Sequence, residues 1–255
     1  MHLDSPIAHR FVASPNHGER IGKARPHLLV LHYTGMRDDQ AALEKLADPA
    51  AEVSCHYFVQ EDGEIIQMVP ENRRAWHAGR SSWEGITDIN SNSIGIEIAN
   101  PGHDWGYRDF SPLQMMALGV LCGDIVRRHA IAPHHVLAHS DVAPLRKADP
   151  GEKFGWAELA EAGVGLFVPP APVTGGRFLS PGETGQAIEA LQAMFALYGY
   201  GIPVTGVYDG LTQAVVKAFQ RHFRPSLVDG ICDSSTIETL RNLIVERDRR
   251  LQAAV

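Results

Sequence analysis

The sequence predicts an α/β domain, in which helices pack on a β-sheet, followed by a small helical domain. Three observations predict this fold: short apolar, β-branched runs mixed with helical patterns before residue 168, a Pro/Gly-rich segment after it, and only short helical patterns beyond. We therefore divide the chain into a domain over residues 1–167, a linker over 168–178 and a helical domain over 179–255.

The sheet elements are predicted from apolar runs that either continue or alternate. These strands are expected over residues 28–32, 54–59, 64–69 and 93–98. Asp62-Gly63 lies between the second and third runs and predicts a hairpin turn. Helices are expected over 39–47 and 112–129, and Ser111-Pro112 supplies an N-cap and a first helical residue for the second of them.

The segment after the linker carries helical spacing and a weak internal repeat. Residues expected on a single helical face are Ile188, Leu191, Phe195 and Leu197, and in the next helix Val215, Ala218 and Phe219. Asp209-Gly210 and Asp229-Gly230 each precede a threonine that opens a helix, which favours a duplicated helical unit. About 75 residues are enough for a small three-helix core.

Composition excludes several classes of function. The 255 residues carry a formal net charge of -7, which argues against broad electrostatic capture of nucleic acid or anionic lipid. Nothing approaches the run of about 20 apolar residues that a membrane helix needs. Asp4 and Pro6 stand where a signal peptide would be apolar, so we expect a soluble cytoplasmic monomer; a different true N-terminus would make it periplasmic. The three cysteines lack CxxC spacing and are expected as free buried thiols.

The segment Ala138–Gly151, A-H-S-D-V-A-P-L-R-K-A-D-P-G, holds the strongest chemical signal. It offers an imidazole (His139), a carboxylate (Asp149) and an ammonium group (Lys147), and its prolines favour a loop that brings them together. His32 closes the first predicted strand, where α/β folds place functional groups. Two histidines and an aspartate would leave a tetrahedral zinc ion one free corner for water.

Glu97 lies in the middle of a strand that otherwise looks buried, flanked by Ile96 and Ile98. Because glutamate is seldom buried without a partner, we interpret it as a general base whose pKa an apolar setting raises. The alternative is a half-exposed strand on which Glu97 points to solvent. Lys147, two residues before Asp149, is placed to approach the attacked water or the developing oxyanion.

Together these residues resemble the zinc-dependent N-acetylmuramoyl-L-alanine amidases of the amidase type 2 family, whose fold is shared with phage-lysozyme-like amidases and peptidoglycan recognition proteins. The matching motifs run in order through residues 27–156: L-V-L-H-Y-T-G, S-C-H-Y-F-V-Q-E-D-G-E-I-I-Q-M-V, A-W-H-A-G, N-S-I-G-I-E-I-A-N and A-H-S-D-V-A-P-L-R-K-A-D-P-G. The resemblance implies a mixed central sheet flanked by helices. It also implies hydrolysis of the amide bond between N-acetylmuramic or anhydro-N-acetylmuramic acid and L-alanine, with one zinc ion per chain.

The resemblance also assigns roles to individual residues. It makes His32, His139 and Asp149 the zinc ligands, Glu97 the catalytic acid/base and Lys147 the stabiliser of the transition state. Positions expected to face substrate are Tyr33, His77 and Asn100.

The tail is similar to the three-helix peptidoglycan-binding module of wall hydrolases, through A-I-E-A-L-Q-A-M-F-A-L-Y-G-Y, V-Y-D-G-L-T-Q-A-V-V-K-A-F-Q and V-D-G-I-C-D-S-S-T-I-E-T-L. An amidase, a linker and a wall module in this order are typical of the periplasmic AmiD-like branch. The lack of an export signal is typical of the cytoplasmic AmpD-like branch, which cleaves anhydro-muropeptides. The expected partners are therefore peptidoglycan fragments or muropeptides.

Two alternatives remain at this point. The first is a recognition protein that holds muropeptides without cutting them, although such proteins typically lack part of the metal set. The second is a serine hydrolase that uses Ser140 beside His139; the chain lacks a G-x-S-x-G elbow, and adjacent side chains do not readily pair as nucleophile and base. Cobalt or nickel would also suit the expected ligands.

Overall fold

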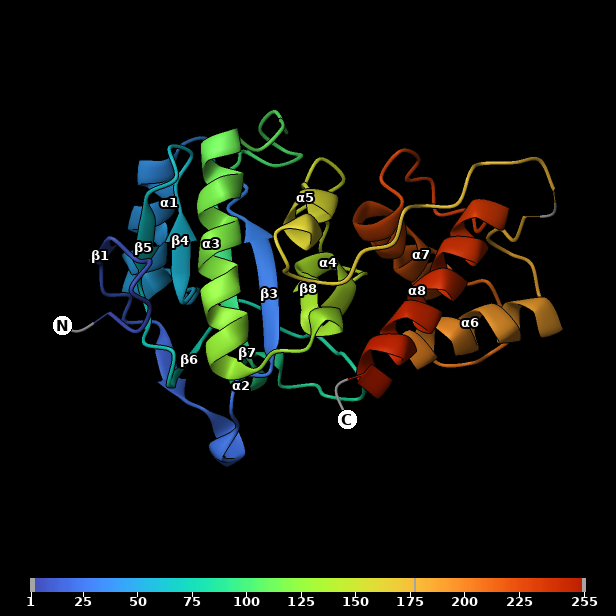
Figure 1. Ribbon diagram of the computed structural model, residues 1–255, viewed down its shortest axis with the longest axis horizontal. Helices are drawn as coiled ribbons and strands as arrows, with labels where there is room; N and C mark the ends of the chain where they lie inside the picture. Colours follow the sequence, from blue (N-terminus) through green and yellow to red (C-terminus); the bar gives the residue numbers. More distant parts are fainter. Residues whose placement is uncertain (1–2, 177, 254–255) are drawn as a thin grey trace.

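The computed structural model describes residues 3–176 and 178–253 of the chain. Within these ranges a part built on a β-sheet precedes a part built from long helices, and the two lie side by side along the longest axis (Figure 1). The helical part follows a stretch without helix or strand, as the sequence predicts. Residues 1, 2, 177, 254 and 255, which belong to the predicted domains and linker, lie outside the described residues.

The main sheet is mixed and has the strand order β1-β5-β4-β7-β3-β8. Only β4 and β5 pair antiparallel, through the predicted turn at Asp62-Gly63, whereas the other neighbours in this sheet are parallel. Its strands are β1 (Arg10–Phe11), β3 (Leu28–Tyr33), β4 (Tyr57–Val59), β5 (Ile65–Gln67), β7 (Ser93–Ile98) and β8 (Val136–Ala138). A separate antiparallel pair joins β2 (His17–Glu19) to β6 (Arg73–Ala75). The four predicted strands are confirmed, and β4 begins later than expected because Ser54 donates its backbone N–H to Trp76 instead.

Helices cover both faces of this sheet. α3 (Pro112–His129) crosses in front of it in Figure 1 and packs on the apolar residues of β3 and β7, whereas α1 (Asp39–Ala47) packs behind β4 on Phe58. The Ser111 hydroxyl accepts the Gln114 N–H at 3.1 Å, so the predicted N-cap is confirmed. The shorter helical segments of the sheet part are η1 (Ile21–Lys23), η2 (Pro49–Ala51), α2 (Ile89–Asn92), η3 (Pro133–His135), α4 (His139–Val142) and α5 (Trp156–Glu161).

The pleat of β7 separates its apolar residues from its polar one. Ile94, Ile96 and Ile98 join the core beneath α3, so Gly95 and Glu97 face the opposite side of the sheet. On β3 the same alternation puts His32 on that opposite side, next to Glu97, which is its register partner. The face that α3 does not cover therefore carries the polar residues of both strands.

The helical part consists of α6 (Gln186–Tyr198), α7 (Gly210–Phe223) and α8 (Ser234–Ala253), and it repeats one arrangement of hydrogen bonds. The buried amide of Gln192 accepts the N–H groups of Thr205 and Gly206 and donates to Thr212. Gln220 makes the same three kinds of hydrogen bond with Asp229, Gly230 and Thr236. Each glutamine thus ties one helix to the loop and the helix start that follow, which confirms the predicted duplication.

One expectation for α6 is wrong. Leu197 is 60% exposed, and Tyr198 takes the inward position instead, after Ile188, Leu191 and Phe195. Steps of three and four residues keep a side chain on one helical face, whereas a step of two turns it away by about half a circle.

The two parts share one apolar core. It contains Leu28 and Val30 of β3 together with buried side chains of all three C-terminal helices. Trp83 is fully buried at the seam, where Tyr198 and Tyr200 meet its ring edge-on, and Gly199 lies against the indole. The helical part is therefore packed on the sheet part rather than tethered beside it.

No described helix combines the length and the apolarity that crossing a bilayer requires.

The contact between Gly199 and Trp83 gives a test of this seam. A Cβ at Gly199 would lie 2.6 Å from the indole, and the backbone there has φ +139°, so Gly199→Ala should lower the free energy of unfolding by about 1–3 kcal/mol or more. Gly175→Ala is the matched control, because its Cβ would meet open space and its φ is not in the left-handed region. Urea unfolding measures both; equal stability of the two variants would contradict the seam described here.

Candidate metal centre and active-site pocket

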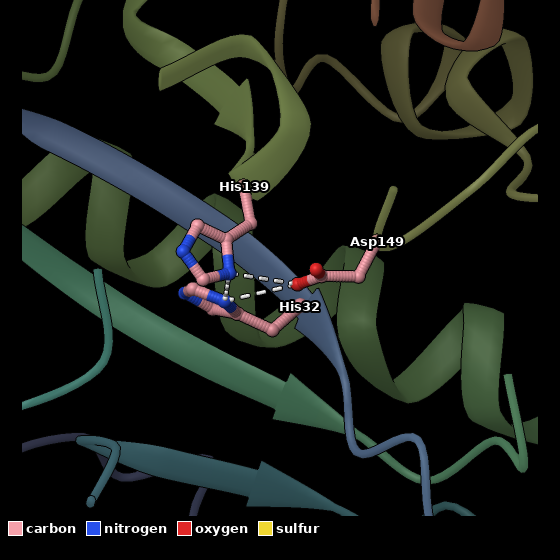
Figure 2. A group of neighbouring side chains, drawn as sticks. All are labelled: His32, His139 and Asp149. Carbon is pink, nitrogen blue, oxygen red and sulfur yellow. Dashed lines mark hydrogen bonds and ion pairs between the residues drawn. The ribbon is translucent and has the colours of Figure 1, made fainter. Parts of the chain in front are cut away.

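Three side chains converge on one point at the open face of the sheet. Nδ1 of His32 lies 2.8 Å from Nδ1 of His139, and both nitrogens lie close to Oδ2 of Asp149, at 3.2 Å and 3.0 Å. Figure 2 shows the three side chains turned toward one another, from three different segments of the chain. A tetrahedral zinc ion with bonds of about 2.0–2.2 Å holds its ligand atoms about 3.3 Å apart, so this spacing fits such an ion closely.

Parallel strand pairing brings two of these ligands together. β3 pairs with β8 so that Leu31 lies opposite Ala138, and the next residue of each segment is His32 or His139. The backbone carbonyl of Asp149 accepts the Ser140 N–H at 3.0 Å, which holds the Asp149 loop next to His139. The set predicted from the sequence is therefore assembled at the carboxyl ends of β3 and β8.

Hydrogen bonds at the far side of each imidazole leave Nδ1 free for a metal. Nε2 of His32 donates to Nδ1 of His77 at 3.0 Å, and His77 in turn donates from Nε2 to the Ser93 hydroxyl at 3.0 Å. Nε2 of His139 donates to the Ala78 carbonyl at 3.1 Å. Such outer partners fix the tautomer and the orientation of metal-binding imidazoles.

The electrostatics favour a neutral imidazole at His32 and an ionised carboxylate at Asp149. Burial, reinforced by the neighbouring His139, lowers the pKa of His32 to about 4, so the ring is neutral at pH 7. Burial by itself would raise the pKa of Asp149, but the two imidazoles hold that pKa below its ordinary value. A neutral imidazole and an ionised carboxylate are the forms that bind a metal.

Glu97 stands on the same face of the sheet, across the strand pairing from His32. Its Oε2 is shielded from solvent and has no hydrogen-bond partner within the described part of the chain. Burial, with a contribution from Asp149, raises the pKa of Glu97 well above its usual range. The side chain is half-buried and lines the pocket beside the ligands, which favours a role in the pocket over the alternative of a solvent-facing strand residue.

Lys147 lies in the same pocket, and its positive charge lowers the pKa values of both His32 and Glu97. Its ammonium group makes no hydrogen bond or ion pair with any described residue, so it is available to a bound ligand. The pocket has a volume of about 450 Å³. Its other polar lining residues include Tyr33, Lys45, Ser54, Trp76, His103, Asp104 and Arg146.

The residues expected to face substrate have different surroundings. Tyr33 lines the pocket, and its hydroxyl lies 3.0 Å from Nδ1 of His103. His77 also lines the pocket, yet both of its ring nitrogens are engaged by His32 and Ser93. Asn100 is not among the lining residues: its amide donates to the Arg108 carbonyl and accepts the Gly102 N–H, so it holds the loop that follows β7. Substrate contact by these three residues stays a prediction.

Ser140 is not placed to act as a nucleophile. Its side chain is fully buried, and its Oγ has no hydrogen-bond partner among the described residues, His139 included. A serine nucleophile needs a base within hydrogen-bond reach and access to substrate, and Ser140 has neither.

The helical part reaches the loop that carries His139, which sequence reasoning missed. Buried Asp141, two residues after His139, accepts hydrogen bonds from the Ala138 N–H, from Nδ1 of His222 and from the Tyr200 hydroxyl, at 2.8, 2.7 and 2.7 Å. The His222 ring is stacked on Trp156 of the sheet part. No local signal could have revealed these partners, because they join residues about 60 and 80 positions apart only through the packing of the two parts.

Sequence reasoning also missed Arg146 and Lys45. The guanidinium of Arg146 donates to the carbonyls of Ala78 and Arg80, and the Ala78 carbonyl also accepts from His139. Arg146 thus ties the segment of Lys147 and Asp149 to the segment of His77. Lys45 reaches the pocket from α1, a helix whose position on the sheet the sequence does not specify.

Comparison with known proteins gives two family matches. The family model of N-acetylmuramoyl-L-alanine amidases matches residues 22–152, and the model of a peptidoglycan binding domain matches residues 184–240. The N-acetylmuramoyl-L-alanine amidase AmiD of Escherichia coli is 39% identical over 228 residues, which cover 83% of this chain and 80% of AmiD.

Two solved structures are similar over most of the chain. One is the complex of AmiD from E. coli with anhydro-N-acetylmuramic acid-L-Ala-D-gamma-Glu-L-Lys, at a TM-score of 0.74 and 36% identity, covering 89% of this chain and 91% of that one. The other is AmpDh3 from Pseudomonas aeruginosa, at a TM-score of 0.73 and 31% identity, covering 96% of this chain and 98% of that one.

Gly95 permits a test of the support behind His32. A Cβ at Gly95 would lie 2.4 Å from the His77 ring, so Gly95→Ala should displace the ring and weaken its hydrogen bond to His32. We expect the affinity for a divalent metal to fall about 10- to 100-fold, measured by competition with a chelator. Gly18→Ala, whose Cβ meets nothing within 4 Å, is the matched control. Unchanged metal affinity in Gly95→Ala would show that His77 does not orient His32.

Proposed function

The chain belongs to the N-acetylmuramoyl-L-alanine amidase family, and from this we propose that His32, His139 and Asp149 hold the zinc ion of its active site. The protein is an amidase that cleaves the bond between N-acetylmuramic or anhydro-N-acetylmuramic acid and L-alanine, in peptidoglycan recycling or turnover. The observation that carries the metal proposal is the convergence of two imidazole nitrogens and one carboxylate oxygen within 3.2 Å of one another.

The donor set suits zinc and leaves a coordination position open. When bound, a zinc ion supplies a Lewis acid that polarises the scissile carbonyl and makes a water molecule acidic near neutral pH. Cobalt and nickel accept the same donors, so metal analysis of protein purified from its native source identifies the ion used in the cell.

We assign the proton transfers to Glu97. A carboxylate with a raised pKa in this pocket is suited to take a proton from the attacking water and to give it up again. The proton then passes to the nitrogen of L-alanine as the carbon–nitrogen bond breaks, which releases a neutral amine and a muramic acid carboxyl group that keeps the second proton of the water. Because Glu97 ends the cycle as it began, one residue serves as base and as acid.

We assign stabilisation of the oxyanion to Lys147. Attack of water turns the carbonyl oxygen into a negatively charged centre, and the Lys147 ammonium group is a cation in this pocket without another partner among the described residues. Tyr33 and His77 line the remaining walls near the ligands, and we propose that they contact the sugar or the peptide stem. For Asn100 we propose an indirect contribution, through the loop that it holds beside Tyr33.

We propose that residues 179–255 form a peptidoglycan-binding unit joined by the 168–178 linker to the amidase domain over 1–167. The match of residues 184–240 to a peptidoglycan binding domain supports this division. The alternative, a recognition protein that does not cut, loses its support because His139, Asp149, Glu97 and Lys147 line one pocket and His32 meets the first two of them.

The compartment of the protein and its substrate are linked, because each compartment holds a different form of peptidoglycan. The cytoplasmic location that the sequence predicts stays a prediction, and it suits soluble anhydro-muropeptides as substrates. The wall-binding match supports the alternative, the periplasm, where intact wall is accessible. Fractionation of the native protein distinguishes the two.

Variants of Glu97 and Lys147 separate chemistry from metal binding. Glu97→Gln should lower turnover by about 10²- to 10⁴-fold and Lys147→Ala by about 10²- to 10³-fold, while each variant retains its metal. Mass spectrometry of released stem peptide and elemental analysis of the protein measure the two quantities. Lys217→Ala, which removes a lysine of α7 outside this pocket, should cleave at the normal rate. Substantial activity in Glu97→Gln would rule out its role as the base.

Wall binding is tested with the inactive full chain. Glu97→Gln should sediment with purified sacculi and should be released when the same sacculi are first digested to soluble fragments by a muramidase. Protein that stays in the supernatant with intact sacculi would refute the wall-binding role of residues 179–255 without affecting the amidase assignment.

A further inference from the structure

A second group of metal-binding side chains lies at the other end of β8. His134 and His135 belong to η3, immediately before β8, whereas His139 follows the last residue of that strand. Glu84, from the turn after Trp83, meets the two imidazoles. The amidase mechanism uses none of these three residues, and none of them lines its pocket.

Their geometry suits a single ion. One ligand atom from each residue lies within 4.8 Å of the other two. Nε2 of His135 is 3.0 Å from one oxygen of Glu84, and Nε2 of His134 is 4.0 Å from the other oxygen. These separations bracket the distance of about 3.3 Å between ligands of a tetrahedral ion, so a small rotation of the exposed Glu84 side chain would complete the site.

His134 is the one of these three residues whose ring has no hydrogen-bond partner among the described residues. It is 8% exposed, and its ring nitrogens make no hydrogen bond with any described residue. Burial, with the adjacent His135, lowers the pKa of His134 to about 4, so this ring is neutral and offers a lone pair. No described residue occupies the ring nitrogens of His134 by a hydrogen bond, so one of them is available to a metal ion.

The charged groups around Glu84, His134 and His135 allow a cation to bind there. The hydrogen bond from His135 lowers the pKa of Glu84, which is therefore an ionised carboxylate. The nearby cation, Arg247, is paired with the Asp248 carboxylate at 2.8 Å and donates to the Leu197 carbonyl. Its charge still contributes to lowering the pKa values of Glu84 and His134, but its hydrogen bonds go to Asp248 and Leu197 and not to Glu84.

The backbone holds the ligands in place before any ion binds. Glu84 donates its N–H to the Gly199 carbonyl at 2.8 Å, at the end of α6, and His135 donates its N–H to Ala132 at 2.9 Å. The turn of Glu84 thus touches the helical part, whereas η3 belongs to the sheet part. An ion held here would fasten the amino end of β8 to the turn of Glu84, whose N–H meets the end of α6.

We propose that Glu84, His134 and His135 form a second site for a divalent transition metal, separate from the catalytic centre, which fastens the Glu84 turn that meets the helical part to the start of β8. Two imidazoles and one carboxylate suit zinc, nickel or copper rather than magnesium or calcium. The remaining positions on the ion would be taken by water.

Zinc stoichiometry tests the proposal on the full chain. Protein stripped with a chelator is dialysed against Zn²⁺, and bound metal is measured by elemental mass spectrometry. We expect two ions per chain in the native sequence, and one in each of Glu84→Gln and His135→Asn, both of which retain amidase activity. Asp149→Asn should lose the catalytic ion and keep the second. The matched control is His129→Asn, which removes a histidine whose partner carboxylate, Glu71, is already held by Arg128.

Thermal unfolding supplies a readout that is independent of activity. Zn²⁺ should raise the unfolding temperature of Asp149→Asn by about 5 °C, and it should leave Asp149→Asn/His135→Asn unchanged. One ion in the native chain, or two in both Glu84→Gln and His135→Asn, would overturn the second site. If Asp149→Asn bound as many ions as the native chain, the assignment of the catalytic zinc would instead be wrong. The two failures are therefore distinguishable.

Discussion

The parallel pairing of β3 with β7 on one side and with β8 on the other is the constraint on which the site depends. A strand register fixes which residues stand side by side and which face they share, and here it sets His32 beside Glu97 and aligns Leu31 with Ala138. A slip of one residue in β3 would turn His32 into the core beneath α3. The two ligands, the candidate base and the open face of the sheet therefore follow from one set of backbone hydrogen bonds.

Next to these paired strands, the buried polar groups of the site have separate roles. The bonds from His32 to His77 and from His139 to Ala78 occupy the outer nitrogens and leave the inner ones for a metal. Glu97 differs from these histidines, because one of its oxygens is shielded and unpaired among the described residues. A buried acceptor without a partner is costly for stability, and a site that moves protons gives a reason to keep it.

The helical part is joined to this chemistry as well as to the apolar core. Asp141 receives hydrogen bonds from Tyr200 and His222 just beyond the ligand His139, so the packing of the two parts and the position of the ligand loop are linked. The proposed second metal site lies at the opposite end of the same short strand. β8 would then be fastened to its surroundings at both ends, by the catalytic ligands at one and by Glu84 with its histidines at the other.

The sequence alone determined the order of elements and the residue types of the site. Strand alternation, the cap at Ser111 and the Asp62-Gly63 turn are local signals, so they predicted β3, β4, β5, β7, α1 and α3, and ordered motifs named His32, Glu97, His139, Lys147 and Asp149. Tertiary structure decided what those residues touch: His77 as the support of His32, Asn100 as a loop residue, Lys45 in the pocket, and the contact of Asp141 with His222. These contacts join segments far apart in the chain, and their geometry depends on strand register and on the packing of two domains, which no local pattern encodes.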